Sequence, residues 1–420
     1  MGDRIRFYLN RIGERLWVRP LAIGMLSTAG VFLAKTADDT GLDRLLPEIS
    51  SDSLGTLLKI ISSSMLVIAT FSVGSMVSAY ASASNTATPR SFPVVLSDDV
   101  SQNALSTFIG AFIFSIVALI ALMDGYYDKA GRFALFALTL MVFAIVILTF
   151  VRWVDNIARL GRLGGTVDKV EEKTAAALTQ RRCAPNLGGV PMGPRQNGGQ
   201  PIYGDSIGYL QRVDVAALQK CAEKSRVRIT VVALPGTFSA PGRALAYVTA
   251  DSDDLSEIDT SQIGQAFLIG GSRKFDEDPR FGLVVLSEIA SRALSPAVND
   301  PGTAIDVIGT FVRLFARWSA PTEESDRSSS TCDRVEVAEI SLRDMFDDAF
   351  SAIARDGAGT VEVVVRLQKA LAALASIGDP TMRDNAIHHA RLALARAENK
   401  LELPADLEVV RKSAEFANAA

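Results

Sequence analysis

Four long apolar runs occupy the first 155 residues and constrain the fold more than any other feature of this chain. A helix that crosses the hydrocarbon core of a bilayer, about 30 Å thick, needs roughly 20 mostly apolar residues. Each run meets that length, and the last three contain no Asp, Glu, Lys or Arg. Burial of all four in a soluble core is the weaker alternative. The sequence therefore predicts four membrane-spanning helices, at residues 16–34, 60–89, 104–123 and 133–151.

The composition of the whole chain fits a membrane part joined to a water-facing part. Hydrophobic residues make up 48% of the 420 residues, which is high for a soluble protein and low for one entirely in a membrane. No small-x-small cleavage site follows the first apolar run, so we interpret this run as an uncleaved helix rather than a signal peptide. The predicted fold class is an α-helical membrane domain of four spans, followed by a mixed α/β, mainly helical, cytoplasmic domain.

The distribution of basic residues predicts the orientation in the membrane. Cytoplasmic segments beside membrane spans carry an excess of Lys and Arg. Five arginines precede or open the first span, four basic residues follow the last, and the first connecting loop is acidic. We therefore expect a multi-pass protein of the bacterial cytoplasmic (inner) membrane with both termini in the cytoplasm. The stretch "DRIRFYLNRIGERL" (3–16) has apolar residues at helical spacing and predicts a basic amphipathic helix on the inner membrane surface.

Charge and cysteine content limit the partners. The net charge of −4 gives no indication of nucleic-acid binding. The three cysteines form no CxxC pair or metal-binding pattern and are typical of free thiols in a reducing compartment. We expect no cofactor, and the lipid bilayer is the one partner that the composition indicates directly.

Changes in composition divide the chain into four predicted parts. Residues 1–155 form the transmembrane domain with its N-terminal basic helix. Residues 156–200 contain an exit helix and a linker rich in Gly and Pro. Residues 201–255 form a small β-rich unit, with strands such as "VRITVVAL". Residues 256–420 form a helical cytoplasmic domain, which is interrupted by an exposed polar loop at 319–334.

The stretch "RALSPAVNDPGTA" (292–304) contains the most distinctive polar residues of the helical domain. Pro296 ends the preceding helix, and Asp300 with Pro301 is a strong start signal for the next one. We therefore predict a corner between two helices. Its candidate structural or ligand-binding residues are Arg292, Ser295, Asn299, Asp300 and Thr303.

The second predicted span is rich in serine, alanine and glycine. Small residues favour close helix–helix packing in membranes, which is the first interpretation and the reason to expect a homo-oligomer. The second interpretation is that the hydroxyls line a water-filled path, with the second spans of several copies around an axis. The candidate pore-lining residues are Ser64, Ser75, Ser78 and Ser82.

An enzymatic role has less support from the sequence. Asp276, Asp278, Glu288, Asn299, Asp300 and Asp306 are oxygen donors of the kind that Mg²⁺ or Ca²⁺ prefers. Ser295 is a possible nucleophile, but the only histidines are His388 and His389, far along the chain. No GxSxG, Walker A, HExxH or GxGxxG motif occurs in a suitable context. We therefore assign no catalytic, cofactor-binding or metal-binding residues and expect no enzyme.

Several stretches resemble a bacterial family of predicted membrane proteins, domain of unknown function 2254. "DEDPRFGLVVLSEIASRALSPAVNDPGTA" (276–304) is similar to its DP-x-FG and SP-x-x-NDP-x-TA patterns, and "TPRSFPVVL" (88–96) and "PGTFSAPGRAL" (235–245) also resemble it. The resemblance implies a four-span membrane region with a cytoplasmic domain, and it implies no activity, substrate or cofactor.

Two functional hypotheses remain ahead of the enzyme. In the first, the protein is an oligomeric channel- or transport-like assembly, with the Ser-rich second span lining a path and the cytoplasmic domain acting as gate or vestibule. The absence of intramembrane charge in spans two to four argues against a proton-coupled carrier. In the second, the protein is a membrane-anchored structural or regulatory module, and the corner is purely architectural. A metal-dependent enzyme at the corner is the least favoured hypothesis.

Overall fold

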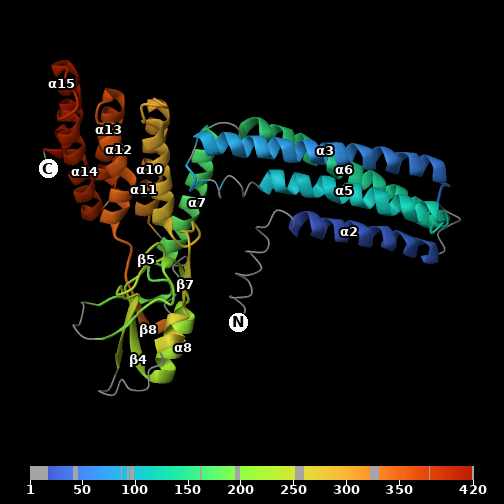
Figure 1. Cartoon of the computed structure of the whole chain (residues 1–420), viewed down its shortest axis with the longest axis horizontal. Coiled ribbons are helices and arrows are strands. Elements are labelled where there is room, and N and C mark those ends of the chain that lie inside the picture. Colours follow the sequence, from blue (N-terminus) through green and yellow to red (C-terminus); the bar gives the residue numbers. More distant parts are fainter. Residues whose placement is uncertain are drawn as a thin grey trace. The chain divides into compact units, whose positions relative to one another are not determined.

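The computed structural model divides the chain into two compact units, and each is described by itself (Figure 1). The membrane unit comprises Met1–Thr166, and the second unit comprises Val167–Ala420. The predicted amphipathic helix at 3–16 lies outside the described residues. The structure describes residues 18–40, 46–86, 88–91, 94, 99–160, 163–193, 199–250, 260–321, 331–377 and 379–418.

Four long apolar helices form the membrane unit, as the sequence predicts. All four are long and apolar enough to cross a bilayer, with windows of mean hydropathy between 1.3 and 2.8. The candidate spans are Val18–Asp39, Ser51–Ser78, Val100–Met123 and Lys129–Ile157. The helices themselves are α2 (Val18–Lys35), α3 (Ser51–Thr86), α5 (Asp99–Met123) and α6 (Lys129–Leu160).

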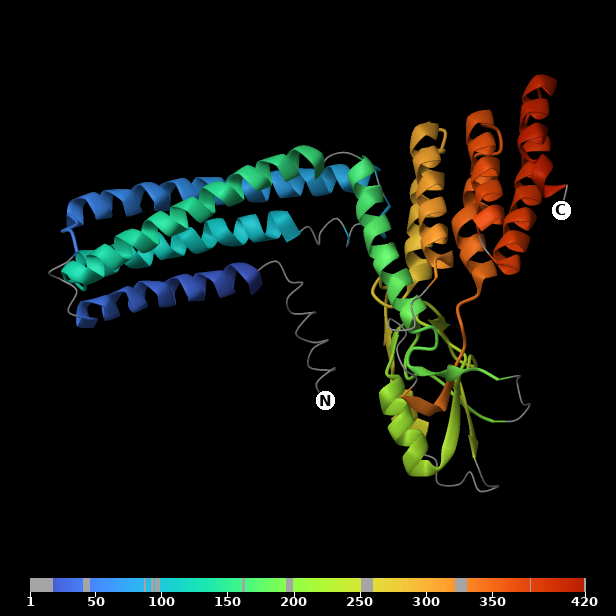
Figure 2. The same ribbon diagram turned by 180° about the vertical axis from the view of Figure 1, so that it is seen from behind.

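Helix α5 makes the most extensive contacts in the bundle, chiefly with α2 and α3, and it also contacts α6. Helices α2 and α5 run in the same direction, as two hydrogen bonds show. Arg19 Nη1 donates to Asn103 Oδ1 (3.1 Å) where both helices begin, and the Tyr127 hydroxyl donates to Val31 O (2.7 Å) where both end. Gly110 permits this close approach, since a β-carbon there would overlap the Ile23 side chain. Alternating directions along α2, α3, α5 and α6 follow the up-and-down order expected of four consecutive spans (Figure 2).

One carboxylate holds the start of α6. Asp38 lies in the short 3-10 helix η1 (Thr36–Thr40) and accepts hydrogen bonds from the backbone N–H groups of Asp128 (3.0 Å) and Gly131 (2.5 Å). Lys35 lies 3.2 Å from the same carboxylate. Because the first N–H groups of a helix have no partner within that helix, Asp38 acts as a cap supplied by another segment.

Two small sheets form one end of the second unit. The larger has the order β1-β8-β4-β6-β2. Strand β8 pairs in parallel with β1 and β4, whereas β6 pairs antiparallel with β4 and β2. The smaller has the antiparallel order β5-β3-β7. The short helix α8 packs against β8 and β4. The elements are β1 (Gly189–Pro191), β2 (Gln200–Ile202), β3 (Gly208–Val213), α8 (Val215–Ser225), β4 (Val227–Val231), β5 (Phe238–Ser239), β6 (Ala246–Ala250), α9 (Thr260–Gly264), β7 (Phe267–Gly270) and β8 (Cys332–Val337).

The sheets draw on more of the chain than the predicted β-rich unit at 201–255. Strand β1 comes from the predicted Gly/Pro linker, and β7 and β8 come from the predicted helical domain. The polar loop at 319–334 therefore ends earlier than predicted, because residues 332–337 form the strand beside β4. Polar Arg334 and Glu336 alternate there with the buried Val335 and Val337, and this alternation is the signature of a strand with one buried face.

Six helices form the other part of the second unit, here called the helical stack. Short turns join α10 to α11 and α12 to α13, so consecutive helices run antiparallel (Figure 2). Helix α12 packs between α10 and α14, and α13 contacts α11, α14 and α15. The helices are α10 (Pro279–Ala293), α11 (Pro301–Ser319), α12 (Leu342–Asp356), α13 (Val361–Ile377), α14 (Pro380–Glu398) and α15 (Pro404–Ser413), followed by η4 (Glu415–Ala417).

Aromatic side chains fill the core of the stack. Phe311 and Phe315 of α11 meet Phe346 and Phe350 of α12, with ring centroids 4.6 to 5.6 Å apart, and all four are fully buried. Large rings of this kind supply much of the apolar area that a small helical core removes from water. The stack therefore has a continuous aromatic core between α11 and α12.

Helix α7 (Leu163–Cys183) packs along the first two helices of the stack. Arg182 donates to the carbonyl oxygens of Arg317 (2.6 Å) and Ala320 at the end of α11. At Gly282 of α10 the two backbones approach so closely that a β-carbon would overlap the Thr174 side chain of α7. This contact fixes how the first helix of the second unit lies on the stack.

We predict that Gly282→Ala destabilises the protein by about 1–3 kcal/mol, because overpacking at a close helix contact forces neighbouring side chains to shift. Thr174→Ala in the same chain should recover most of that loss, since it removes the overlapping atoms. Thermal unfolding in detergent of both single variants and the double variant checks this. Additive losses in the double variant would show that the two residues do not touch.

Candidate functional site

The corner between α10 and α11 has the predicted form. Helix α10 ends at Ala293, Asp300 caps α11, and the Asp300 N–H donates to the Ala293 carbonyl (2.8 Å) to close the turn. Asn299 has a left-handed backbone with φ of 51°, a conformation that Asn tolerates better than most residues. The Ser295 hydroxyl donates to the Arg292 carbonyl (2.7 Å). These groups make the turn.

Asp300 uses both carboxylate oxygens within α11. Its Oδ1 accepts the Thr303 N–H (3.1 Å) and its Oδ2 accepts the Thr303 hydroxyl (2.6 Å). The structure thus brings all five predicted corner residues into one helix–turn–helix segment. The hydrogen bonds of Ser295, Asp300 and Thr303 are those of a turn and an N-cap.

The oxygen donors of the metal hypothesis do not converge. Asp278 caps the start of α10 and Asp300 caps the start of α11, so the whole of α10 separates them. A helix of 15 residues is about 22 Å long at 1.5 Å per residue. Across the part of the chain that the structure describes, no group of three or more His, Cys, Asp or Glu is placed to hold a metal ion.

His389 belongs to the core of the stack. Its ring lies 5.7 Å from that of Phe346 and 6.3 Å from that of Phe350. Burial lowers the pKa of His389 to about 4, against the opposing effect of Asp347, so the imidazole is neutral near pH 7. Its role is packing.

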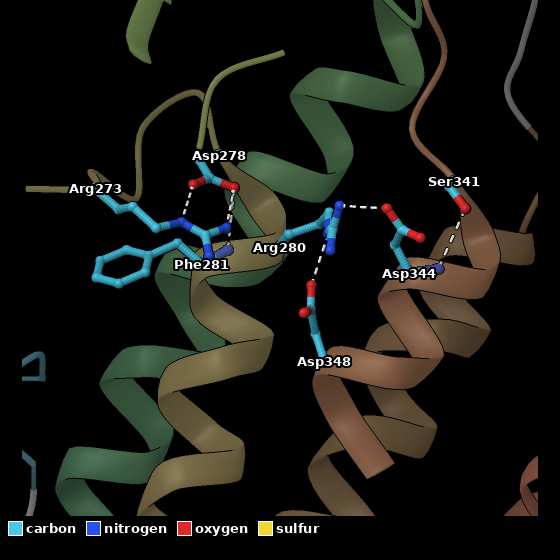
Figure 3. A network of polar contacts seen from close by, with 7 residues as sticks. All are labelled: Arg273, Asp278, Arg280, Phe281, Ser341, Asp344 and Asp348. Atoms are coloured by element: carbon cyan, nitrogen blue, oxygen red, sulfur yellow. Dashed lines mark hydrogen bonds and ion pairs between the residues drawn. The ribbon is translucent and has the colours of Figure 1, made fainter. Parts of the chain in front are cut away.

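A network of ion pairs, here called the root network, joins the start of α10 to α12 (Figure 3). Asp278, which is 3% exposed, caps α10 through the Phe281 N–H (3.1 Å) and accepts two hydrogen bonds from Arg273, at 2.7 and 2.9 Å. Gly236, with φ of 96°, lies so close that a β-carbon there would overlap the Asp278 carboxylate. One buried carboxylate thus joins a β-turn, a loop and a helix.

Arg280 carries the network to α12. Its Nε donates to Asp348 Oδ2 and its Nη1 to Asp344 Oδ2, both at 2.6 Å. Ser341 caps α12 by accepting the Asp344 N–H (3.2 Å). Burial raises the pKa of Asp348, against the lowering effect of Arg280. Sequence reasoning identified the DP-x-FG segment but missed these partners, because 64 and 68 residues separate them from Arg280 and no local pattern relates them.

An open groove of about 770 Å³ runs along the exposed face of α7. Three acidic side chains lie at the end of the groove nearest the N-terminus of α7, and two alanines follow along the helix. Arg317 of α11 contributes a basic side chain. Glu171 is already paired with Arg313 of α11, which holds the pKa of Glu171 below its usual value. The lining residues are Asp168, Glu171, Glu172, Ala175, Ala176, Thr179, Gln180 and Arg317.

The candidate pore-lining serines lie on the outside of the single bundle. Ser64 and Ser78 are exposed and Ser75 is half-buried, while the side chain of Ser82 lies outside the described residues. The bundle interior is filled by fully buried side chains such as Phe108, Phe114 and Trp153. A path along these serines therefore requires more than one copy of the chain.

A known protein family matches most of this chain. The model of a family described as "Predicted membrane protein (DUF2254)" matches residues 13–373, from before the first apolar helix into α13. No solved structure matches the chain.

Two mycobacteria contain relatives of this chain. Proteins of Mycobacterium bovis and Mycobacterium tuberculosis, each described as uncharacterized, are 26% identical to this chain over 322 residues. The match covers 73% of this chain and 61% of each relative, so the chain spans less than two thirds of their length.

We predict that Asp300→Ala costs about 1 kcal/mol of stability through the lost N-cap, and that Asp300→Asn costs much less, because Asn caps nearly as well. Chemical or thermal unfolding of the two variants in detergent measures the difference. If the Asn variant were as unstable as the Ala variant, Asp300 would stabilise the helix through its charge and not through its capping hydrogen bond.

Proposed function

The chain belongs to the DUF2254 family of predicted membrane proteins, and on that premise we propose that it is a membrane-anchored docking module whose second unit binds a basic segment of a partner protein. The observation that carries this proposal is the groove along α7. It is open, it lies on a helix that packs along the helical stack, and its acidic residues are not all used internally.

The charges of the groove determine which partner fits. Asp168 and Glu172 are exposed, while Glu171 is neutralised by Arg313. The small side chains of Ala175 and Ala176 leave room for a second helix or an extended chain to lie against α7. Surface acids attract basic partners and set specificity through charge complementarity. Lys- or Arg-rich segments are thus the expected occupants.

The orientation in the membrane is part of the proposal. Arginine and lysine are concentrated before the first candidate span and after the last, and such residues remain on the cytoplasmic side. We therefore place both termini and the second unit in the cytoplasm of a bacterium, with the four candidate spans in the inner membrane. The basic partner is then a cytoplasmic protein or the cytoplasmic segment of a membrane protein.

A photo-crosslinking amino acid at Ala176, in cells, tests the docking proposal. We expect one discrete adduct there and none at Glu408, an equally exposed position on α15 that serves as control. The double reversal Asp168→Lys with Glu172→Lys should weaken the complex about tenfold or more, or ~1.4 kcal/mol. Glu408→Lys should leave it unchanged. Equal labelling from both positions, or insensitivity to the reversal, would rule out this groove.

A conducting assembly of several copies is the second candidate, and one observation favours it. At about 100° per residue, Ser64, Ser75, Ser78 and Ser82 fall within about 60° of arc on α3. Beside this stripe, Gly74 has no neighbouring atom where its side chain would be. Glycine and serine on an exposed helix face favour close association of helices in lipid. A homo-oligomer packed around α3 is therefore the structural basis of the conducting assembly.

Recording from planar bilayers that contain the purified protein tests this candidate. Ser78→Leu should reduce or alter a current if α3 lines the path, whereas Val151→Leu, an exposed apolar position on α6, should not. Bilayers that stay silent under voltage, tension and varied ions would remove this candidate and leave the docking proposal untouched.

A further inference from the structure

A second polar junction lies beside the root network, where α7, β3 and the start of α10 meet. Arg181, near the end of α7, donates from Nη2 to the Glu277 carbonyl (3.0 Å). Arg212 of β3 places its Nε 3.2 Å from the Glu277 carboxylate. Backbone and side chain of one residue, Glu277, thus hold two different elements.

Arg181 is the most enclosed charge of this junction. It is 4% exposed, and its Nη1 is buried with no hydrogen-bond partner among the described residues. Burial lowers the pKa of Arg181, while the nearby Glu277 and Asp278 act in the opposite direction. A guanidinium that leaves one nitrogen unsatisfied makes the attachment of α7 sensitive to any change in its neighbours.

The surroundings of Glu277 oppose its ionisation. Its side chain is only 21% exposed, and Asp214 of the β3–α8 turn and Asp276 of its own loop add negative charge nearby. Arg212 and Arg181 favour the carboxylate. Burial outweighs them and raises the pKa of Glu277 to about 7.

We propose that Glu277 is a proton-responsive latch, whose protonation tightens and whose ionisation loosens the attachment of the end of α7 to β3 and to the start of α10. The geometry supports this assignment because three elements meet at one residue: Arg212 of β3 faces the half-buried Glu277 carboxylate, and Arg181 of α7 bonds the Glu277 carbonyl at the start of α10. Since α7 is the first helix after the last candidate span, the latch regulates the element through which the second unit is tethered. It also lies on the helix that carries the proposed groove, but it does not depend on any partner.

The direction of the pH dependence follows from the pKa. The folded value of about 7 lies above the ordinary value of 4.5, so between them the folded protein binds a proton that the unfolded chain has released. The contribution of Glu277 to stability is therefore complete below pH 4.5 and falls as the pH rises through 7. The attachment of the end of α7 therefore loosens across the neutral pH range, where Glu277 of the folded protein ionises.

Unfolding of the full-length protein in detergent or nanodiscs between pH 5.5 and 8.5 tests the proposal. Glu277→Gln mimics the protonated form, so it should unfold above the wild type already at pH 5.5, and the gap should widen by about 3 °C or more by pH 8.5. Hydrogen exchange of residues 175–183 should quicken with pH in the wild type beyond the intrinsic rate, and should not do so in Glu277→Gln.

Glu171→Gln is the matched control. Glu171 also joins α7 to a neighbouring element, but Arg313 keeps its pKa low, so this variant should differ from the wild type by the same amount at every pH tested. Arg212→Gln removes the cation nearest Glu277 and should move the wild-type transition to higher pH. Parallel stability curves for Glu277→Gln and the wild type, or a gap that widens toward acid pH, would overturn the proposal.

Discussion

The second unit depends on the hydrogen bonds that the buried Asp278 carboxylate accepts. This carboxylate is almost fully buried, and removal of such a charge from water costs several kcal/mol unless hydrogen bonds replace the hydration. Arg273 and the Phe281 N–H supply those bonds. Because Gly236 leaves room for the carboxylate, the turn at Gly236, the loop at Arg273 and the start of α10 meet at this group. Loss of either partner would leave a buried charge without compensation, which destabilises more than the absence of the pair.

Features that depend on neighbouring residues could be predicted from the sequence. The four spans follow from apolar length, and the corner follows from the Asp300–Pro301 signal, which the structure shows in full with Thr303 as the residue that Asp300 caps. Pro380 begins α14 in the same way, with Asp379 as its cap. In each case one carboxylate and the residue three positions later contain the whole interaction, so distant residues are not needed.

Features that depend on distant residues could not be predicted. Strand β8 is six residues long and follows a polar stretch, and its parallel pairing with β4 and β1, a hundred or more residues earlier, makes it a strand. Arg280 and Asp348 are each ordinary surface residue types until the stack places them together. The acidic face of α7 was also not predicted as a groove, because its second wall is supplied by Arg317 of α11.

The two units satisfy their polar groups by different rules, and this difference bears on function. In the membrane unit, exposed hydroxyls bond to their own helix: Ser63 to the Ile60 carbonyl (3.1 Å) and Thr70 to the Leu66 carbonyl (2.9 Å). Such back-bonding allows a hydroxyl to face lipid without a polar partner. An exposed hydroxyl on α3 is therefore not in itself a sign of water, and several copies are needed before the serine stripe becomes a path.

In the second unit, several charged groups are paired with one another, as in the root network and at Glu171 with Arg313. The exposed acids Asp168 and Glu172 lie on an open face, where they are screened by water and weak individually. That arrangement suits recognition of a long, charged surface, since many weak contacts add up across it.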